Sequence, residues 1–214
     1  MNEHYFDEID TPNKAYILGF LYADGYNNKI TNSIILTLKD SDSDILENIR
    51  QEIGCEKPLY NYSYINKNDG KERHLSSLIL SSKYMSDTIE KWGLIPNKTF
   101  VLKFPDFLDE NLYSHFIRGY FDGDGTACIY HDKTRENTRI TAAIMSSIEF
   151  CDGLGEYLKN IGINFHVNMA SGHENNKVVR SSDPIEVKKF VDFIYKNADL
   201  YMKRKYNKFI NWFN

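Results

Sequence analysis

The stretch FIRGYFDGDGT (Phe116–Thr126) decides the fold of this chain, because a related stretch, YILGFLYADGY (Tyr16–Tyr26), lies 100 residues before it. Each stretch is apolar, fits a helix, and ends in Asp-Gly. A short β-like run and an amphipathic helix follow each stretch. Both of these later helices stop at a glycine, Gly54 and Gly162, as is usual for the residue after a helix. The chain therefore contains an internal repeat, which predicts two copies of one structural unit.

Each copy has the order helix, two strands, helix, two strands, helix. The strands alternate between apolar and polar residues, which is typical of a sheet with one face packed on helices and one face open. The sequence predicts an α+β protein with two tandem α-β-β-α-β-β-α repeats, residues 1–103 and 104–214, related by pseudo-twofold symmetry. The proline-containing stretch 96–111 is the expected linker.

Composition excludes several classes of protein. The 214 residues are 42% hydrophobic and 14% aromatic, as in globular proteins. The sequence has no apolar run near the roughly 20 residues that span a bilayer, and the first ten residues do not resemble a secretory signal. The three cysteines form no CxxC pair and the six histidines match no metal-ligand spacing. We expect an intracellular, monomeric protein of the cytoplasm, nucleoid or an organelle, without disulfides, zinc or membrane contact.

The charge distribution bears on nucleic-acid binding. The net charge of −4 argues weakly against it, because nucleic-acid-binding proteins usually show a basic patch. The charge is uneven, however: residues 131–214 have a net charge of +3 and residues 1–130 of −7. Since a local basic cluster can meet phosphate on its own, the total charge does not exclude a nucleic-acid partner.

The repeated helix has small residues on one stripe. Gly19 and Ala23 are four residues apart, and Gly119 and Gly123 repeat the arrangement. Glycine within a helix costs about 1 kcal/mol relative to alanine, so its presence on the same stripe of both copies needs a reason. Close approach of two helix backbones supplies one. We expect these four residues to form a helix–helix interface between the repeats.

This packing would bring Asp24 and Asp124 together at the C-terminal ends of the two helices. Each helix end adds a partial negative charge, so the arrangement requires a cation. Carboxylate oxygens suit Mg²⁺ or Mn²⁺, and the backbone carbonyls of Ala23 and Gly123 are candidate additional ligands. The glycines that follow the two aspartates are expected to adopt a left-handed turn. A divalent metal held in this way indicates phosphodiester hydrolysis.

At these residues the sequence resembles the LAGLIDADG homing endonucleases. ILGFLYADG (Ile17–Gly25) and IRGYFDGDG (Ile117–Gly125) look like the two motifs of that family. The resemblance implies a pseudo-dimeric, site-specific double-strand DNA endonuclease in one chain. It implies central motif helices and two saddle-shaped antiparallel sheets that read the major groove. It also implies that Asp24 and Asp124 bind the divalent metal and are catalytic.

The resemblance implies further site residues. The family tends to place a basic residue near each active site, and here Lys98 and Lys205 are the candidates. Tyr22 stands where the motif usually has an acid, whereas the second copy keeps Asp122 there. The family does not generally use that position as a metal ligand, so the change does not predict loss of activity. Arg118 is unusual in the second motif, and we expect it to point outward.

Residues that contact DNA are expected on the open strand faces and the hairpin tips, where Lys and Arg suit phosphate or guanine and Asn suits adenine. The candidates are Lys29, Ser33, Lys67, Arg73, Lys133, Arg135, Arg139, His166, Asn168 and Arg180. Tyr60, Tyr62 and Tyr64 share a face at period two, and core packing explains such a stripe more often than DNA contact does.

Two other functions remain open from sequence. The first is a non-cleaving nucleic-acid-binding protein on the same fold, either an intron RNA maturase or a DNA-binding regulator. The presence of both Asp24 and Asp124 favours the enzyme, because a binding protein has no use for two repelling carboxylates. The second is an α+β protein that binds no nucleic acid, which the net charge of −4 favours.

Overall fold

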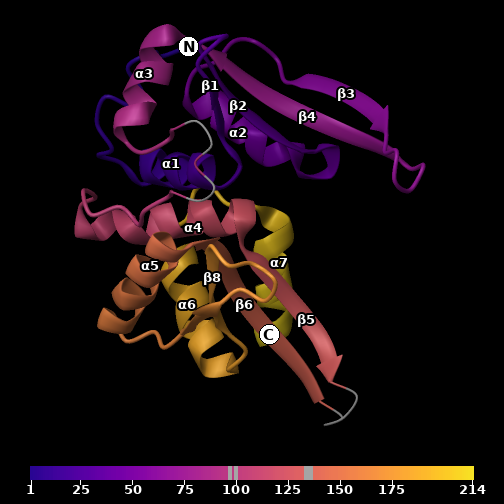
Figure 1. Ribbon diagram of the computed structural model, residues 1–214, viewed down its shortest axis with the longest axis vertical. Helices are drawn as coiled ribbons and strands as arrows, with labels where there is room; N and C mark the ends of the chain where they lie inside the picture. The colour runs from indigo at the N-terminus through magenta and orange to yellow at the C-terminus, as the bar shows by residue number, and fades with distance from the viewer. Residues whose placement is uncertain (96–97, 99–100, 133–136) are drawn as a thin grey trace.

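The computed structural model describes residues 1–95, 98, 101–132 and 137–214. Each repeat forms its own four-stranded antiparallel sheet, with strand orders β1-β2-β4-β3 and β5-β6-β8-β7 (Figure 1). The predicted α+β fold with two repeats is confirmed. The boundary predicted between residues 103 and 104 lies between the last helix of the first repeat and the first helical turn of the second.

The two repeats have the same order of α-helices and strands and differ in the place of a short 3₁₀ helix. The first contains α1 (Pro12–Asp24), β1 (Tyr26–Asn28), β2 (Ser33–Lys39), η1 (Asp40–Asp42), α2 (Ser43–Glu52), β3 (Tyr60–Ile65), β4 (Glu72–Ser81) and α3 (Lys83–Lys91). The second contains η3 (Glu110–Leu112), α4 (Tyr113–Asp124), β5 (Thr126–Asp132), β6 (Asn137–Ser147), α5 (Ile148–Asn160), β7 (His166–Met169), β8 (Asn176–Ser181) and α6 (Pro184–Tyr195). A further helix, α7 (Lys203–Phe213), follows α6 and has no counterpart in the described part of the first repeat.

Local sequence fixes the two ends of α1. Thr11 caps its N-terminus by accepting a hydrogen bond of 3.3 Å from the N–H of Lys14, and Pro12 occupies the first helical position, where no N–H is needed. Gly25 ends the helix in an extended conformation with φ of −72°, and Gly125 does the same after α4 with φ of −70°. The expected left-handed turn at these glycines is wrong.

Space explains these two glycines better than backbone freedom does. A Cβ atom at Gly25 would lie 2.5 Å from the carbonyl oxygen of Leu21, and one at Gly125 would lie 2.3 Å from the ring of Phe121. The left-handed conformation occurs instead after α2 and α5, where Gly54 and Gly162 have φ of +68° and +81°. The prediction of helix-ending glycines at those two positions is confirmed.

The two motif helices, α1 and α4, pack against each other at the centre of the molecule, between the two sheets (Figure 1). Their backbones approach so closely that a Cβ atom at Gly19 would lie 2.0 Å from the carbonyl oxygen of Phe116. A Cβ atom at Gly119 would lie 1.9 Å from the carbonyl oxygen of Tyr16. Further along, the space beside Gly123 is filled by the Cβ of Ala23. Only glycine permits this contact.

Each sheet packs one face on helices and leaves the other open. In β2 and β4 the core side chains are Ile34, Leu36, Leu78 and Leu80, which are at most 2% exposed. The long hairpins β3–β4 and β5–β6 extend toward the same side of the molecule, away from the α1–α4 contact (Figure 1). Met145 and Asn176 of the second sheet line a cavity with Asp124, and Thr37 and Leu75 of the first sheet line another with Asp24. Within the described residues, no helix combines the length and the apolar character needed to cross a membrane.

Candidate active site and nucleic-acid face

Asp24 and Asp124 are the last residues of α1 and α4. The carboxylate of Asp24 lies across the end of the other helix: its Oδ2 is 3.2 Å from the point where a Cβ of Gly123 would stand. Asp24 is half-buried, and Asp124, next to Gly123, is exposed on the open side. The contact between the helices thus brings both acids to one place, as the position of the small residues suggested.

The two carboxylates influence each other electrostatically. Burial, and next the charge of Asp124, raise the pKa of Asp24 to about 6, while Lys205 and Lys98 act to lower it. Desolvation also raises the pKa of Asp124, again against the effect of Lys98 and Lys205. A raised carboxylate pKa means that the ionised form is disfavoured. The pair therefore takes up a proton more readily than carboxylates in water do, and a bound cation would offset the same negative charge.

Each of the two helix ends is bound by one lysine. Nζ of Lys98 donates to the carbonyl oxygens of Ala23, at 3.2 Å, and Gly25, at 2.6 Å. Nζ of Lys205 donates to the carbonyl oxygens of Phe121, at 2.7 Å, and Gly123, at 2.9 Å. In both cases the lysine contacts the carbonyl that directly precedes the aspartate.

The lysines therefore offset the partial negative charge of the helix ends. Burial lowers the pKa of Lys205 to about 8, and burial also lowers the pKa of Lys98. Both amines are thus less basic than a lysine in water. The structure brings together Asp24, Asp124 and the two lysines, all of which were candidates from sequence.

The donor set suits a hard divalent cation. Ala23 and Gly123 were candidate ligands through their carbonyl oxygens, and each of these oxygens accepts a lysine hydrogen bond. A carbonyl oxygen has two lone pairs, so one remains available. In the part of the chain that the structure describes, no group of three or more His, Cys, Asp or Glu side chains could hold a metal. Two carboxylates completed by waters and substrate phosphate are typical of Mg²⁺.

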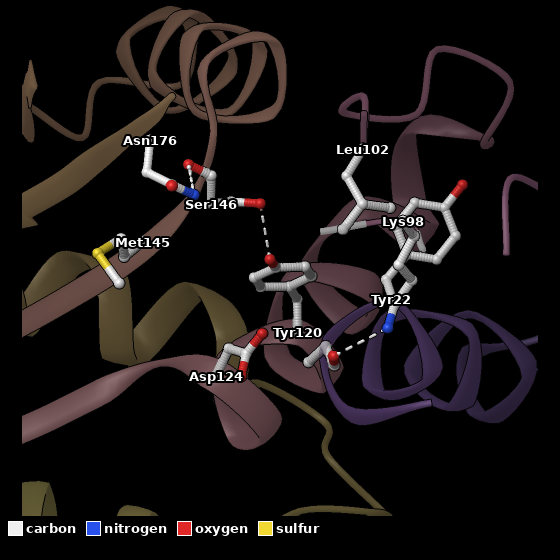
Figure 2. Close-up of a pocket in the computed structure, with 9 residues that line it drawn as sticks. Tyr22, Lys98, Leu102, Tyr120, Asp124, Met145, Ser146 and Asn176 are labelled. Atoms are coloured by element: carbon white, nitrogen blue, oxygen red, sulfur yellow. Dashed lines mark hydrogen bonds between the residues drawn. The ribbon is translucent and has the colours of Figure 1, made fainter. Parts of the chain in front are cut away.

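A cavity beside Asp124 and Lys98 contains residues that sequence reasoning missed (Figure 2). The hydroxyl of Tyr120 donates to Oγ of Ser146 at 2.8 Å. The side-chain amide of Asn176 donates to the carbonyl oxygen of Ser146 at 3.1 Å. Tyr120 lies within the quoted motif and was a possible signal. Asn176 reaches the cavity only through the β6–β8 pairing, which no local pattern shows.

The position two residues before each aspartate is structural. Asp122 is fully buried, and its carboxylate accepts hydrogen bonds from the hydroxyls of Tyr16 at 3.0 Å and Tyr195 at 2.8 Å and from the N–H of Met202 at 2.7 Å. Burial raises its pKa to about 6, against the effect of these bonds. In the first repeat, the hydroxyl of Tyr22 donates to the carbonyl oxygen of Trp92.

The expectation that Arg118 points outward is wrong, because its side chain is 0% exposed. Its Nε donates to the carbonyl oxygen of Leu200 at 2.8 Å, and its Nη1 donates to that of Ile194 at 2.8 Å. The guanidinium also lies 5.0 Å from the ring centroid of Tyr16. Backbone carbonyls, the ring of His115 and an aromatic face surround this charge in place of water, and among the described residues Nη2 has no hydrogen-bond partner.

Candidate DNA-contacting residues of the second sheet lie on its open face. Arg139 alternates with the buried Ile140 in β6. Arg180 is paired in register with His166, and Asn168 follows His166 on the same face of the edge strand. In the first sheet, Arg73 shares the open face, and the exposed Lys67 lies in the hairpin that precedes it.

Two candidates of the first repeat are engaged by neighbouring side chains. Nζ of Lys29 forms ion pairs with Asp87 at 2.6 Å and Glu90 at 3.0 Å, which direct it to α3. Ser33 is 3% exposed, and its hydroxyl bonds that of Thr31 at 2.6 Å. The remaining candidates, Lys133 and Arg135, lie outside the described residues.

The tyrosine stripe of β3 is exposed, so the expectation that it packs in the core is wrong. Tyr60, Tyr62 and Tyr64 are 60%, 38% and 47% exposed. Strand β3 is one of the two edge strands of the first sheet, and its register places Tyr64 opposite Arg73 on the open face. The rings of Tyr60 and Tyr62 stack with centroids 5.6 Å apart. The face is thus lined by aromatic as well as basic residues.

Comparisons with known proteins agree with this architecture. Residues 111–194 match the family model described as LAGLIDADG-like domain. Among solved structures, the chain is similar to the LAGLIDADG homing endonuclease I-GzeII in complex with its DNA target, with a TM-score of 0.60 and 10% identity over 94% of this chain and 88% of that one. It is also similar to I-SmaMI bound to cleaved DNA, with a TM-score of 0.60 and 12% identity over 95% and 87%.

A third similar structure is I-LtrWI bound to target DNA, with a TM-score of 0.58 and 14% identity over 99% of this chain and 88% of that one. No curated protein matches this chain in sequence. At these identities the structural likeness establishes the fold. The resemblance noted in the sequence is confirmed.

Proposed function

We propose that this chain, whose second repeat is a LAGLIDADG-like domain and whose fold is that of the LAGLIDADG homing endonucleases, is a site-specific double-strand DNA endonuclease. The observation that supports this most directly is the meeting of Asp24 and Asp124 at the ends of α1 and α4, with one lysine on each helix end. Two like charges in one place are costly, and DNA cleavage supplies a use for them.

A divalent cation, Mg²⁺ or Mn²⁺, would be held by Asp24 and Asp124, with the carbonyl oxygens of Ala23 and Gly123 as further ligands. When bound, the cation polarises the scissile phosphate, lowers the pKa of the attacking water and stabilises the leaving oxygen.

The cationic side chains beside the two aspartates are Lys98 and Lys205. Their ammonium groups stand beside the carboxylates and can stabilise the negative charge that develops on the phosphate. Because burial lowers the pKa of Lys205 to about 8, a fraction of this amine is neutral near physiological pH. The neutral amine can take a proton from water at Nζ. The cavity beside Asp124, with Tyr120, Ser146 and Asn176, offers polar groups that can orient that water.

The open sheet faces would bind duplex DNA. Arg139, Arg180 and Asn168 of the second sheet offer groups that suit guanine, phosphate and adenine, respectively. Arg73 and the exposed tyrosines offer a matching surface on the first sheet. Because one chain supplies both faces and both aspartates, we propose that it acts as a monomer. Three solved structures of similar fold were determined with DNA, which supports this partner.

The alternative is a binding protein of the same fold that does not cleave, either an intron RNA maturase or a DNA-binding regulator. Such a protein needs the sheet faces and not the paired carboxylates. The raised pKa of Asp24, caused first by burial and next by the charge of Asp124, supports a free-energy cost of ionising both acids in the unliganded protein. A cost of this kind favours the enzyme over the binding protein.

The test is selection of cleaved sites from a randomised duplex DNA library in the presence of Mg²⁺. The wild-type chain should yield one preferred site, and Asp24→Asn and Asp124→Asn should abolish cleavage. A gel shift on the selected duplex, with a salt titration, should show that both variants still bind. Binding without cleavage by the wild type would establish the alternative. Absence of any salt-dependent binding would exclude both functions.

A further inference from the structure

We propose that each site lysine is held on its helix end by buried polar side chains that anchor the segment leading to it. In the first repeat these positioning residues are Tyr22 and Asn27, and in the second they are Arg118 and Asp122. They do not touch the carboxylate pair or the reacting atoms. Their consequence for cleavage rests on the proposed function, whereas the anchoring itself does not.

The second repeat shows the shortest connection. The carboxylate of Asp122 accepts the N–H of Met202 at 2.7 Å, and Met202 is the residue that caps the N-terminus of α7. The carbonyl oxygen of Met202 accepts in turn the N–H groups of Lys205 and Tyr206, both at 3.1 Å. One residue therefore joins Asp122 to the backbone of Lys205. The same α4 helix that ends at Asp124 thus sets the place where α7 begins.

Arg118 fixes the rest of this connection. Its guanidinium reaches Ile194 in the last turn of α6 and Leu200 in the loop that follows, with both carbonyl oxygens at 2.8 Å. The end of α6 is therefore bound to α4 at one point and the loop between α6 and α7 at two, Leu200 and Met202. A charged side chain with 0% exposure is unusual unless its bonds serve a specific arrangement.

The first repeat reaches the same result with different chemistry. Position 22 corresponds to position 122, and the hydroxyl of Tyr22 donates to the carbonyl oxygen of Trp92 at the end of α3. The next residue, Gly93, has φ of +94°, and a Cβ there would lie 2.2 Å from this hydroxyl. The hydroxyl of Tyr22 therefore fills the space that a side chain at position 93 would need. Lys98 follows five residues after Gly93.

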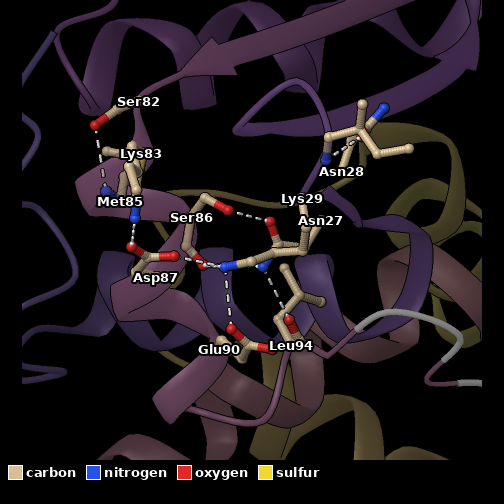
Figure 3. A network of polar contacts seen from close by, with 11 residues as sticks. Asn27, Asn28, Lys29, Ser82, Lys83, Met85, Ser86, Asp87, Glu90 and Leu94 are labelled. Carbon is tan, nitrogen blue, oxygen red and sulfur yellow. Dashed lines mark hydrogen bonds and ion pairs between the residues drawn. The ribbon is translucent and has the colours of Figure 1, made fainter.

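Asn27 holds the other side of the same segment (Figure 3). Its Nδ2 donates to the carbonyl oxygens of Leu94 at 3.3 Å and Ser86 at 2.9 Å, while its Oδ1 accepts the hydroxyl of Ser86 at 2.6 Å. Asn27 is 2% exposed and belongs to β1, the strand that follows Asp24. Residues 92–94 are thus bound to both elements that flank the first aspartate.

Tyr22 and Asp122 occupy equivalent positions and have the same structural role, although their side chains differ chemically. A phenol that donates to a carbonyl and a carboxylate that accepts an amide N–H both tie the motif helix to the segment before a site lysine. Packing alone would be satisfied by apolar side chains, which avoid the cost of burying polar groups. The departure of Tyr22 from the motif therefore preserves the geometry by other means.

The test that needs no DNA measures how readily each lysine amine is acetylated by an N-hydroxysuccinimide ester, followed by mass spectrometry of the intact, folded chain. Tyr22→Phe should raise labelling of Lys98 by about 3- to 10-fold, the factor that one lost buried hydrogen bond represents, and leave Lys205 unchanged. Tyr113→Phe is the matched control, because its hydroxyl also donates to a backbone carbonyl, that of Pro105, at the far end of α4.

The corresponding experiment in the second repeat should affect the other lysine. Asp122→Ala should raise labelling of Lys205 and not of Lys98. Asp122→Asn retains an oxygen that can accept the Met202 N–H and should restore most of the protection. If Asp122→Ala does not fold, the Tyr22→Phe experiment decides. Equal increases at both lysines, or none in a folded variant, would overturn the proposal.

Strand-resolved cleavage of the selected duplex links anchoring to function. The strand that Tyr22→Phe slows should be the one that Lys98→Met slows, and the double variant should be no slower than Lys98→Met alone. Slowing of both strands alike would indicate general destabilisation and contradict the proposal. Unchanged cleavage in Lys98→Met would instead remove the lysine from the proposed mechanism, while the labelling experiment still decides the anchoring.

Discussion

Arg204 of α7 forms a two-pronged ion pair with Asp42 of the first repeat. Nε of Arg204 lies 3.0 Å and 3.1 Å from the two carboxylate oxygens of Asp42, and Nη2 lies 3.0 Å from Oδ2. The helix that presents Lys205 is therefore attached to both repeats, through Asp122 on one side and Asp42 on the other. This relationship joins the last helix of the chain to the turn that follows β2.

Asp42→Asn should reduce stability only slightly. The side chain of Arg204 is 50% exposed, so solvent screens much of the attraction. We expect a loss of about 0.5–1 kcal/mol in the free energy of unfolding, as for other partly exposed pairs. Urea unfolding at low and at high salt measures it, and the difference between wild type and variant should shrink with salt. A loss several times larger would mean that the pair holds the repeats together.

Gly119→Ala should be far more destabilising. The added methyl group would lie 1.9 Å from the carbonyl oxygen of Tyr16, so α1 and α4 would have to separate. Overpacking typically costs about 1–3 kcal/mol, and we expect the upper end of this range or more because backbone rather than a flexible side chain must move. Gly172→Ala is a suitable control: the described residues leave open space there, and the cost is about 1–2 kcal/mol from its φ of +78°. Equal losses in the two variants would show that the helices do not need this close contact.

The sequence predicted the repeats, the central helix pair and the carboxylate pair because each depends on a pattern that occurs twice. It predicted Lys98 and Lys205 only through the resemblance to the LAGLIDADG homing endonucleases. No local pattern shows where a linker or a terminal helix packs against the rest of the protein. The burial of Arg118 and its hydrogen-bond partners could not be predicted from the sequence. Its position in the motif indicates a helix, but the carbonyls that accept its bonds come from residues 76 and 82 positions later.

Strand pairing explains why the prediction for the tyrosine stripe was wrong and why none was made for Asn176. Tyr60, Tyr62 and Tyr64 alternate as half-buried strands do, and their pairing with β4 places all three rings on the open face of the sheet rather than the covered one. Asn176 reaches the cavity beside Asp124 because β8 pairs with β6, an arrangement set by tertiary contacts. Local alternation fixes which residues share a face, but it does not fix which face is covered.

The unliganded protein should lose stability as the pH rises. The folded state raises the pKa of Asp24 from 3.8 to about 6, so the folded chain binds a proton that the unfolded chain releases between these values. The contribution is therefore present below about pH 4 and is lost by about pH 7, with a size of up to about 3 kcal/mol.

Asp24→Asn removes this contribution and provides the comparison. Asp122, whose pKa burial also raises to about 6, titrates in both proteins, so its effect cancels in the difference. Chemical unfolding over this pH range should show the wild type falling relative to Asp24→Asn. A constant difference would mean that Asp24 is not desolvated in the folded protein.

Addition of Mg²⁺ or Mn²⁺ should reverse the loss of folding stability that the wild type shows as the pH rises. A cation that binds the two ionised carboxylates stabilises the folded state by mass action and competes with protons. We expect the Tm of the wild type to rise with the metal near neutral pH and the rise to vanish near pH 5, where Asp24 is mostly protonated. Asp124→Asn should weaken the response. A Tm rise as large as that of the wild type in both Asp24→Asn and Asp124→Asn would place the metal elsewhere.

Two basic residues on the DNA face should respond differently to mutation. Lys67 is exposed in the β3–β4 hairpin, and its flexible ammonium suits phosphate rather than a base edge. Lys67→Ala should weaken binding to all sequences alike and reduce the salt slope of log K by about 1. Arg180 instead stands on the open face of β8, opposite His166, where its planar guanidinium can reach a guanine in the major groove.

Arg180→Ala should therefore relax the preference at one base pair of the selected site, at a cost of about 1–3 kcal/mol for that pair. Gel shifts on the selected duplex and on duplexes with each substituted base pair measure this, at two salt concentrations. Because the salt slope and the base preference are independent readouts, the two variants test the two kinds of contact separately. A uniform loss of affinity in Arg180→Ala would assign that guanidinium to phosphate and move base reading to its neighbours.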